Sequence, residues 1–393
     1  MDFKPNKLIF LTSRFPYPLN KGDKLRGYYQ LKSLSKEFEI HLICIDEKEV
    51  SQESLNAIAP FCSSVNYFVL PKYKRILSLI QSFWKGTPLQ VAYFYNKTID
   101  KAIQKNIVHI NPDYIHCHLI RTTEYVKNIQ GISLSLDFMD AFANGMEKRL
   151  QIESNFLKRC LFSYEKRKLK KYEFDTFNYI DRHCIISKQD RDAILNLDKK
   201  PITIVANGVD FEKFYPREVH KKYDLLFMGN MSYPPNIVAV QFLVEDIMPL
   251  ILKECPSITL LIAGIGTPKR IKKYESKNIK IQEYFEDISD SIACSKVMIA
   301  PMLISIGLQN KILQAMAMNV PCIVSSLSNK PIGAIAGFSI LEANSALEFS
   351  STAISLLNNK QKLQKIASNG YKFVRGKYSW SKQSQSLKRL ILK

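Results

Sequence analysis

The chain has 393 residues, of which 46% are hydrophobic and 23% are charged. This is enough apolar material for two or three domains with buried cores, and it excludes a disordered or fibrous chain. Fifty-six Lys and Arg against 36 Asp and Glu give a formal net charge of +20, which favours acidic partners: nucleic acid, anionic lipid or phosphorylated small molecules. No apolar run approaches the ~20 residues of a membrane-spanning helix, and residues 1–5 do not resemble a signal peptide, so we expect a chain that is not exported.

Eight cysteines occur without a C-x-x-C pair, and several lie in apolar runs, as Cys44 and Cys322 do. Neither a disulfide framework nor a zinc site has this pattern. We therefore predict reduced, structural cysteines, as is usual in the cytoplasm.

Short apolar runs alternate with longer amphipathic stretches along the chain. Residues 7–11 form one such run, a helical pattern follows at 24–37, and further strands are predicted at 39–45, 113–117, 133–137 and 183–186. The pattern starts again near residue 201, with strands predicted at 202–206, 223–228, 257–263, 297–300 and 321–325. Continuous apolar strands separated by helices indicate an α/β fold with doubly wound parallel sheets. We expect two Rossmann-like domains, at 1–200 and 201–376, and a last helix at 377–393.

The loop after the first predicted strand is basic. Gly22 permits a close backbone approach, and Lys21, Lys24 and Arg26 place positive charge at a helix start. The loop could bind an anion or could be an ordinary solvated basic loop. It lacks the G-x-x-x-x-G-K pattern of a P-loop.

His116 and His118 lie two residues apart, on one face of a predicted strand end. A metal site would need at least one further ligand nearby, and the sequence marks none. Such a pair is usually structural, although the position at the strand end favours a functional role for His118.

Residues 299–326 carry the most information. A strand is predicted to end at Pro301, a loop carries Gly307, and a helix is predicted at 308–318. Free N–H groups at that helix start, with Lys311 one turn in, would form an anion site. Packing alone explains the apolar residues but not the polar group at the helix entrance, Gln309, Asn310 and Lys311.

Several segments together resemble the retaining, two-domain glycosyltransferases of family 4, and the bacterial exopolysaccharide or exosortase-associated branch most closely. The matching segments span nearly the whole chain: 15–26, 136–140, 207–210, 227–236, 307–318 and Pro321. The resemblance implies a GT-B fold, in which two Rossmann-like domains face a central cleft. It also implies that the nucleotide-sugar binds to the C-terminal domain, that the acceptor binds to the N-terminal domain, and that the last helix returns to the N-terminal domain.

The resemblance also implies roles for individual residues. His118 and Asp140 would be catalytic and would orient the donor sugar and the acceptor. The acceptor loop would comprise Lys21, Gly22, Asp23, Lys24 and Arg26. The donor would bind to Gly229, Asn230, Gly264, Tyr284, Phe285, Gly307, Leu308, Asn310, Lys311 and Gln314. No metal or other cofactor is implied beyond the nucleotide-diphosphate-sugar, and the acceptor would be a glycan or a polyprenyl-diphosphate-linked glycan.

The sequence departs from the family pattern at four places. Ile306 and Gln314 stand where the family has two glutamates that contact the donor sugar and the ribose. Asn230 and Pro235 stand where it has an Arg and a Lys on the diphosphate. Lys311 and the helix start must then hold the diphosphate, and a catalytically inactive nucleotide-sugar-binding subunit is the alternative to a hexosyltransferase-type enzyme.

Two other functions fit the sequence less well. A nucleic-acid-binding protein would interleave basic and aromatic residues on one sheet face or carry a known module, and neither is found. A nucleotide-sugar 2-epimerase is disfavoured by the first loop and by residues 207–210.

Residues 148–171 carry nine cations against two acidic residues, with apolar residues interleaved at roughly helical spacing. This stretch could be a helix with a solvated basic face. It could also rest on the anionic inner face of the cytoplasmic membrane, which would make a cytoplasmic protein peripheral.

Overall fold

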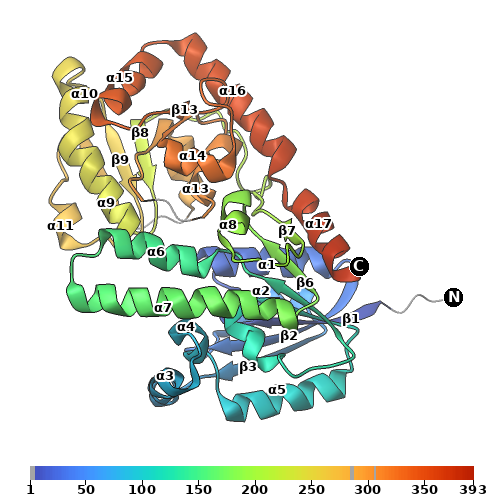
Figure 1. Cartoon of the computed structure of the whole chain (residues 1–393). Helices are drawn as coiled ribbons and strands as arrows, with labels where there is room; N and C mark the ends of the chain where they lie inside the picture. The colour runs from blue at the N-terminus through green and yellow to red at the C-terminus, as the bar shows by residue number, and fades with distance from the viewer. Residues whose placement is uncertain (1–4, 284–286, 305–306) are drawn as a thin grey trace. The chain divides into compact units, whose positions relative to one another are not determined.

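The computed structural model describes residues 5–283, 287–304 and 307–393, apart from the side chains of residues 83, 85 and 152. The chain forms two compact units. Unit 1 comprises Met1–Ala206 and Trp380–Lys393, and unit 2 comprises Asn207–Ser379. Figure 1 labels the elements of both units.

Unit 1 contains a seven-stranded parallel sheet in the order β3-β2-β1-β4-β5-β6-β7. The strands are β1 Asn6–Thr12, β2 Phe38–Asp46, β3 Ser64–Val69, β4 Tyr114–His118, β5 Ser133–Asp137, β6 Arg182–Ile185 and β7 Ile202–Ile204. The helices are α1 Gly22–Leu34, α2 Gln52–Ile58, α3 Lys72–Lys85, α4 Leu89–Ala92, α5 Lys97–Ile110, α6 Phe142–Ile152, α7 Phe156–Asp175, α8 Lys188–Ala193 and α17 Trp380–Leu392, with short 3₁₀ turns at Ala59–Phe61, Ile120–Tyr125 and Thr176–Asn178.

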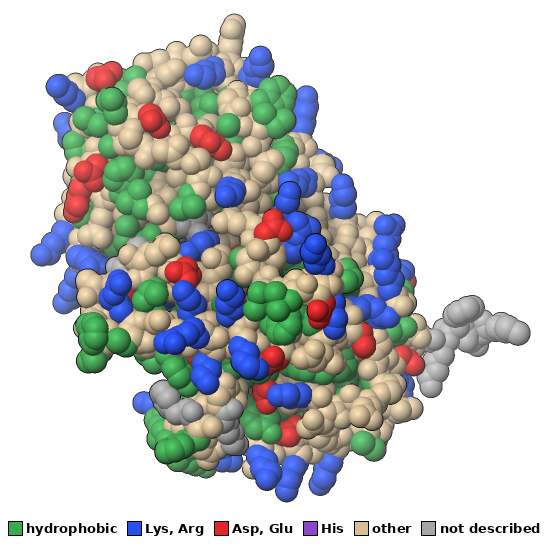
Figure 2. Space-filling view, in the orientation of Figure 1, with side chains coloured by type: hydrophobic (Ala, Val, Ile, Leu, Met, Phe, Trp, Pro, Cys, Tyr) green, Lys and Arg blue, Asp and Glu red, His purple; other side chains and the backbone are tan. Residues whose placement is uncertain are grey.

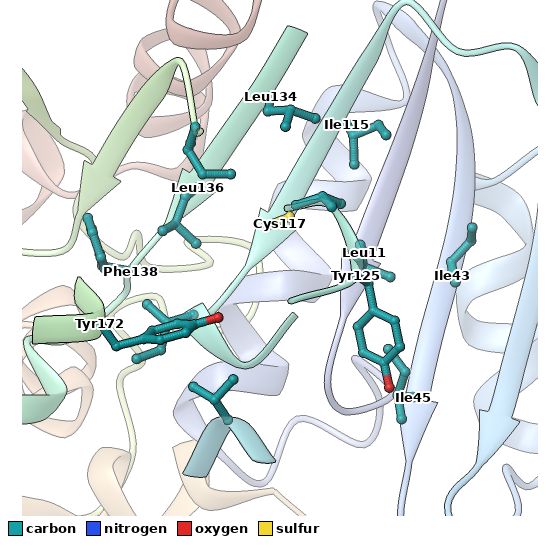
Figure 3. Packing of buried hydrophobic residues seen from close by; sticks show 14 of the residues in the cluster. Leu11, Ile43, Ile45, Ile115, Cys117, Tyr125, Leu134, Leu136, Phe138 and Tyr172 are labelled. Atoms are coloured by element: carbon teal, nitrogen blue, oxygen red, sulfur yellow. The ribbon is translucent and has the colours of Figure 1, made fainter. Parts of the chain in front are cut away.

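Both faces of this sheet are buried. Successive side chains of a strand point to opposite faces, so Leu8 and Phe10 of β1 join one core while Ile9 and Leu11 join the other. The core that contains Leu11 packs under α5, α6 and α7, and Figure 3 shows part of it around Cys117, Tyr125 and Leu136. The other core packs under α1, α2 and α17. This is why the strands read as continuous apolar runs in the sequence.

The last helix, α17, belongs to unit 1, as the family resemblance predicts. The Trp380 ring stacks on the Tyr29 ring of α1 at 4.7 Å between centroids. The Gln383 side-chain oxygen accepts a 2.9 Å hydrogen bond from the Ala206 amide. Leu387 and Ile391 are fully buried in the core beneath α1.

Unit 2 contains a six-stranded parallel sheet in the order β10-β9-β8-β11-β12-β13. The strands are β8 Tyr223–Met228, β9 Leu260–Ala263, β10 Ile279–Gln282, β11 Ser295–Ala300, β12 Cys322–Val324 and β13 Leu341–Glu342. The helices are α9 Pro234–Phe242, continued through a π-turn at Leu243–Ile247 into α10 Met248–Glu254, then α11 Lys269–Lys272, α12 Ile288–Ala293, α13 Asn310–Ala317, α14 Ser326–Ile332, α15 Ala346–Leu357 and α16 Lys360–Lys377. Two parallel Rossmann-like sheets covered by helices confirm the predicted fold class.

The pairing of β7 shows that the boundary between the two domains lies later in the chain than predicted. The run at 202–206 was expected to open the second sheet, but β7 pairs with β6 and forms the edge of the first. Backbone hydrogen bonding between two parallel strands overrides the restart of the sequence pattern, and the units therefore divide at 206/207 and 379/380 rather than at 200/201 and 376/377. Sequence analysis also missed three strands: β3 and β10, which contain polar residues, and β13, which has only two residues.

One helix in the described part of the chain, Pro234–Glu254, is long and apolar enough to cross a membrane by length and composition. Half of it is buried inside unit 2, which is typical of the core helix of an α/β domain. The eight cysteines are all free thiols, and Cys160 is the exposed one among them.

Candidate functional site

In unit 2, two glycines follow neighbouring strands at the carboxyl edge of the sheet. Gly229 follows β8 and Gly264 follows β9. A Cβ atom on Gly264 would lie 1.9 Å from the Gly229 carbonyl oxygen, so no larger residue fits there. The two loop backbones therefore pack directly on one another at the edge where ligands of such sheets bind.

The segment after β8 is held by asparagine side chains. The Asn230 side-chain oxygen accepts a 2.8 Å hydrogen bond from the Ser232 amide and closes a turn. The Asn230 carbonyl oxygen accepts a 2.8 Å hydrogen bond from Asn236 of α9. Asn230 thus shapes the loop, and Asn236, which sequence analysis did not single out, supports it from the first helix turn.

Lys311 of α13 directs its ammonium group toward this loop. Its Nζ donates to the Asn236 side-chain oxygen at 2.8 Å, contacts the Met302 sulfur at 3.4 Å and lies 4.4 Å from the centre of the Phe227 ring. Within the described residues, Lys311 has no ion pair with an Asp or Glu. Burial lowers the pKa of the Lys311 ammonium to about 7. An anion bound here would meet a positive charge that no described carboxylate neutralises.

This low pKa predicts that binding of a nucleoside diphosphate takes up a proton above about pH 7. The protonated amine binds the anion, so the pKa rises in the complex, and affinity should fall by up to about tenfold per pH unit above about pH 7. Titration calorimetry at about pH 8, in buffers of different ionisation enthalpy, measures the uptake directly. In the Lys311→Met variant the uptake should disappear. Uptake that persists in this variant would contradict the assignment to Lys311.

Helix α13 begins at Asn310, two residues later than predicted. Gly307 before it has a φ of 68°, a left-handed conformation that favours glycine. Leu308 is buried, and the Asn310 side-chain oxygen accepts a 3.0 Å hydrogen bond from Asn207. Asn310 is thus tied to the 207–210 segment, and Gln314 lies one turn further along α13, half-buried. Three residues named by sequence analysis, Tyr284, Phe285 and Ile306, lie outside the described residues.

In unit 1, Arg26, which sequence analysis placed in a basic acceptor loop, lies in α1. Its side chain is fully buried and pairs with Asp137 of β5, with Nε 2.6 Å and Nη2 3.1 Å from the two carboxylate oxygens. Nη2 also donates to the Val205 carbonyl oxygen at 2.7 Å, and Gln30 donates to Asp137 at 2.7 Å. Burial by itself would raise the pKa of Asp137, but the Arg26 guanidinium holds it well below its usual range. Arg26 therefore fastens α1 to the sheet, and its predicted place in the acceptor loop is wrong.

Arg14 and Arg121 provide the positive charge at the corresponding edge of unit 1. Arg14 pairs with Asp23 at 2.6 Å, and both guanidinium groups lie over the Phe94 ring, 5.9 Å and 5.2 Å from its centre. Arg121 follows β4 and donates to Gln90 at 3.2 Å, but its buried Nε and Nη1 have no hydrogen-bond partner among the described residues. Burial and the Arg14 charge lower the pKa of Arg121 to about 10. Two guanidinium groups against one carboxylate leave this cluster, which includes Asp23, with an excess of positive charge.

The other residues of the first loop have distinct environments. Lys21 is exposed and precedes α1, while Lys24 donates to the Tyr17 carbonyl oxygen at 3.2 Å and folds back on its own loop. A Cβ atom on Gly22 would lie 3.2 Å from the end of the Met139 side chain. The start of α1 thus lies beside the segment that follows β5, which brings the first loop near Asp140.

His118 is buried at the end of β4. Its imidazole stacks on Phe10 at 5.9 Å and lies near Gly27 of α1, and within the described part of the chain neither ring nitrogen has a hydrogen-bond partner. Burial lowers its pKa to about 4, so the ring is neutral at neutral pH. His116, by contrast, hydrogen-bonds to Ser135 at 2.8 Å within the sheet. His116 is therefore a structural residue of the sheet, whereas the His118 ring has no hydrogen-bond partner among the described residues.

Asp140 follows β5 and is half-buried. Burial, followed by repulsion from Asp190, raises the pKa of the Asp140 carboxyl. Asp190 itself accepts a 2.5 Å hydrogen bond from Ser187. Burial and the neighbouring Asp190 carboxylate therefore favour the protonated form of Asp140. Across the described residues, no group of three or more His, Cys, Asp or Glu side chains is placed to hold a metal ion.

Comparison with known proteins finds a family match within unit 2. Residues 222–359 match the family model of glycosyl transferases group 1. Over 97% of its length the chain is 25% identical to a Klebsiella pneumoniae protein described as an uncharacterized 44.6 kDa protein in the cps region, covering 98% of that protein.

Among solved structures, the sucrose-phosphate synthase of Thermosynechococcus elongatus aligns with a TM-score of 0.71 at 12% identity, over 98% of both chains. The Anabaena protein HepE, solved with UDP and glucose, aligns with a TM-score of 0.68 at 13% identity, also over 98% of both chains. These likenesses establish that the chain has the GT-B fold.

Proposed function

We propose that this chain, whose unit 2 carries a group 1 glycosyltransferase domain within a GT-B fold, is a retaining hexosyltransferase. It would transfer a sugar from a nucleotide-diphosphate-sugar to an acceptor hydroxyl in the synthesis of a cell-surface polysaccharide. The observation that carries the proposal is the Lys311 ammonium, which has no carboxylate partner in the described residues and donates to Asn236, the side chain that packs against Gly229.

Two comparisons narrow the proposal. The Anabaena protein with the same fold was solved with UDP, with UDP-glucose and with UDP and glucose, so UDP-sugars are the first donors to test. The Klebsiella relative is described as lying in the cps region, which supports a role in polysaccharide synthesis. Both properties belong to the other proteins and come to this chain as part of the proposal.

The chemistry follows from these side chains. As the bond to the donor sugar breaks, negative charge develops on the departing diphosphate, where Lys311 and the α13 N-terminus would stabilise it without a metal or other cofactor. Gln314 would hydrogen-bond the ribose without the charge assistance of a carboxylate. In unit 1, the unpartnered nitrogens of His118 and the carboxyl of Asp140 would orient the sugar and the acceptor.

The arginine cluster of unit 1, formed by Arg14, Arg121 and Asp23, favours an acceptor that carries negative charge. Arg121 keeps unpartnered buried N–H groups, and one carboxylate serves the cluster of two guanidinium groups. A planar guanidinium with free donors suits phosphate or carboxylate oxygens. This favours the polyprenyl-diphosphate-linked glycan over a neutral one, and with it a cytoplasmic enzyme working at the membrane.

The test combines binding and turnover. A panel of UDP-, GDP- and TDP-sugars is screened by thermal shift, since a ligand at about 100 times its Kd stabilises by about 2.7 kcal/mol. The stabilising donor, radiolabelled in the sugar, is then incubated with a lipid-linked glycan fraction. We expect label in the lipid phase with the anomeric configuration of the donor. If no nucleotide-sugar stabilises the protein, the proposal is wrong.

The alternative function is an inactive nucleotide-sugar-binding subunit, which the loss of both family glutamates suggests. It predicts a normal thermal shift and no transfer to any acceptor. Restoration of transfer by Gln314→Glu would show that a ribose contact alone had been weakened, whereas continued absence of transfer in this variant would favour the inactive subunit.

A further inference from the structure

Helix α3 of unit 1 exposes its apolar face. Five large apolar side chains recur at the spacing of one helix face, and their exposed fractions range from 49% to 89%. They are Tyr73, Ile76, Leu77, Ile80 and Trp84, which we call the α3 strip. Scattered exposed apolar residues are ordinary, but a contiguous strip on one helix marks an interaction surface.

The opposite face of α3 is attached to unit 1, and among its described side chains Leu79 is apolar and half-buried while the others are polar. Arg75 pairs with Glu47 at 3.2 Å and hydrogen-bonds to the Tyr93 hydroxyl. The Ser78 hydroxyl donates to the Tyr95 carbonyl oxygen at 3.1 Å, and Ser82 is buried. Helix α3 is thus amphipathic in the reverse sense, because its polar side meets the protein and its apolar side faces outward.

The surroundings of the α3 strip are positively charged. The sequence contains no Asp or Glu between Glu53 and Asp100, and Lys72 and Lys74 open the helix. The C-terminal end of α3 approaches α7, because a Cβ atom on Gly86 would lie 3.3 Å from the Lys168 amine. Figure 2 shows apolar side chains over α3 at the lower left, with Lys and Arg side chains over α6 and α7.

We propose that the α3 strip docks unit 1 on an anionic lipid bilayer. An exposed apolar helix face among cations is what binds the boundary between headgroups and acyl chains of acidic lipid. Fourteen residues extend only ~21 Å, so α3 would lie in the surface rather than cross it. Tyr73 and Trp84, at the two ends of the strip, are the residue types enriched at that boundary. A second copy of the chain is a poorer occupant, because it would bring two basic surfaces together.

Sequence analysis placed a possible membrane contact on the basic stretch 148–171, whereas the proposal here places it on α3. In the structure, residues 148–171 form parts of two helices, and several of the cations are paired: Lys166 with Glu147, Lys158 with Glu153 at 3.8 Å and Lys171 with Asp175 at 2.7 Å. Three further exposed apolar residues, Phe156, Leu157 and Leu161, lie at the start of α7. The cations of α7 would then flank the α3 strip rather than carry the contact alone.

The experiment uses the full chain with vesicles of phosphatidylcholine alone or mixed with phosphatidylglycerol. We expect cosedimentation with the mixed vesicles, weakened by salt, and little with the neutral ones. In the triple variant Ile76→Ser, Leu77→Ser, Ile80→Ser, partitioning should fall at least about tenfold, since tenfold corresponds to only about 1.4 kcal/mol. The matched control is Ile335→Ser, Phe338→Ser, Leu347→Ser, which removes three exposed apolar side chains of unit 2 and should leave partitioning unchanged.

The fluorescence emission of Trp84 reports whether the α3 strip itself enters the bilayer, which nonspecific adsorption of the protein would not show. The chain has two tryptophans, so in a Trp380→Phe background the emission reports Trp84 alone, which is 89% exposed. With mixed vesicles its emission should shift to the blue and be quenched by brominated acyl chains. Emission that stays water-like, or unchanged partitioning of the triple variant, overturns the proposal, as does a dimer in solution that the triple variant abolishes. Stabilisation by a nucleotide-sugar is measured on the same variants, so failure of this inference is distinct from failure of the proposed function.

Discussion

Replacing Lys311 by methionine is expected to weaken the binding of UDP by roughly 1.5–3 kcal/mol, the range for a hydrogen bond to a charged group. Methionine keeps an unbranched apolar side chain over the Phe227 ring but removes the ammonium that reaches the edge of the sheet. Titration calorimetry at about pH 7 measures the loss. Because burial disfavours the charged amine in the free protein, the variant should be folded and about as stable as the parent.

The matched control is Lys296→Met. Lys296 lies at the start of β11, at the amino edge of the same sheet, and pairs with Asp224 at 2.8 Å. The Lys296→Met substitution removes a lysine charge from unit 2 at the sheet edge where ligands of parallel sheets do not bind. Equal UDP affinity in the Lys311 and Lys296 variants would show that Lys311 does not contact the diphosphate.

The Arg26→Met substitution is expected to destabilise unit 1 by about 3–5 kcal/mol, because it leaves the Asp137 carboxylate buried without its counter-ion. Denaturant unfolding followed by Trp380 fluorescence measures this, since Trp380 stacks on α1. Adding Asp137→Asn should recover part of the loss, since it removes the unpaired charge and keeps one of the two oxygens that accept from Gln30 and the Met139 amide.

An exposed ion pair of the same unit serves as control for this prediction. Lys388 of α17 pairs with Glu37 at 2.7 Å, and both side chains are more than a third exposed. Lys388→Met should therefore cost at most about 1 kcal/mol. A similar cost for Arg26→Met would mean that Asp137 is solvated or protonated when Arg26 is absent, and that the pair does not fasten α1.

Much of the architecture follows from local patterns in the sequence. The predicted strand at 223–228 agrees with β8 residue for residue, and that at 133–137 agrees with β5. Both strands are covered by helices on either face. The β8 segment is mostly apolar, whereas β5 alternates Leu with Ser and ends in Asp137. Gly264 was likewise recognisable, because a glycine after a buried strand indicates close backbone approach, here to the Gly229 carbonyl.

The candidate site was less accessible to sequence analysis. Lys311 was named from its place in a helix start, but its partner Asn236 lies 75 residues away and is positioned by α9. Arg121 was missed because an arginine after a strand has no distinguishing local pattern. Its burial against Phe94 and its unpartnered N–H groups exist only once distant segments have packed together.

The sequence by itself determined the fold class and the two sheets, because periodic apolar burial is a local property of each strand and helix. The return of the last helix to unit 1 was implied by the family resemblance and not by the periodicity. Only the tertiary structure decided which charged side chains are available to bind a ligand. Arg26 and Arg14 stand in the same basic loop, yet Arg26 is buried on Asp137 while Arg14 remains at the sheet edge with Asp23. In the same way, only packing revealed that α3 turns its polar face inward, because a helical repeat shows that a helix has two faces and not which of them meets the protein.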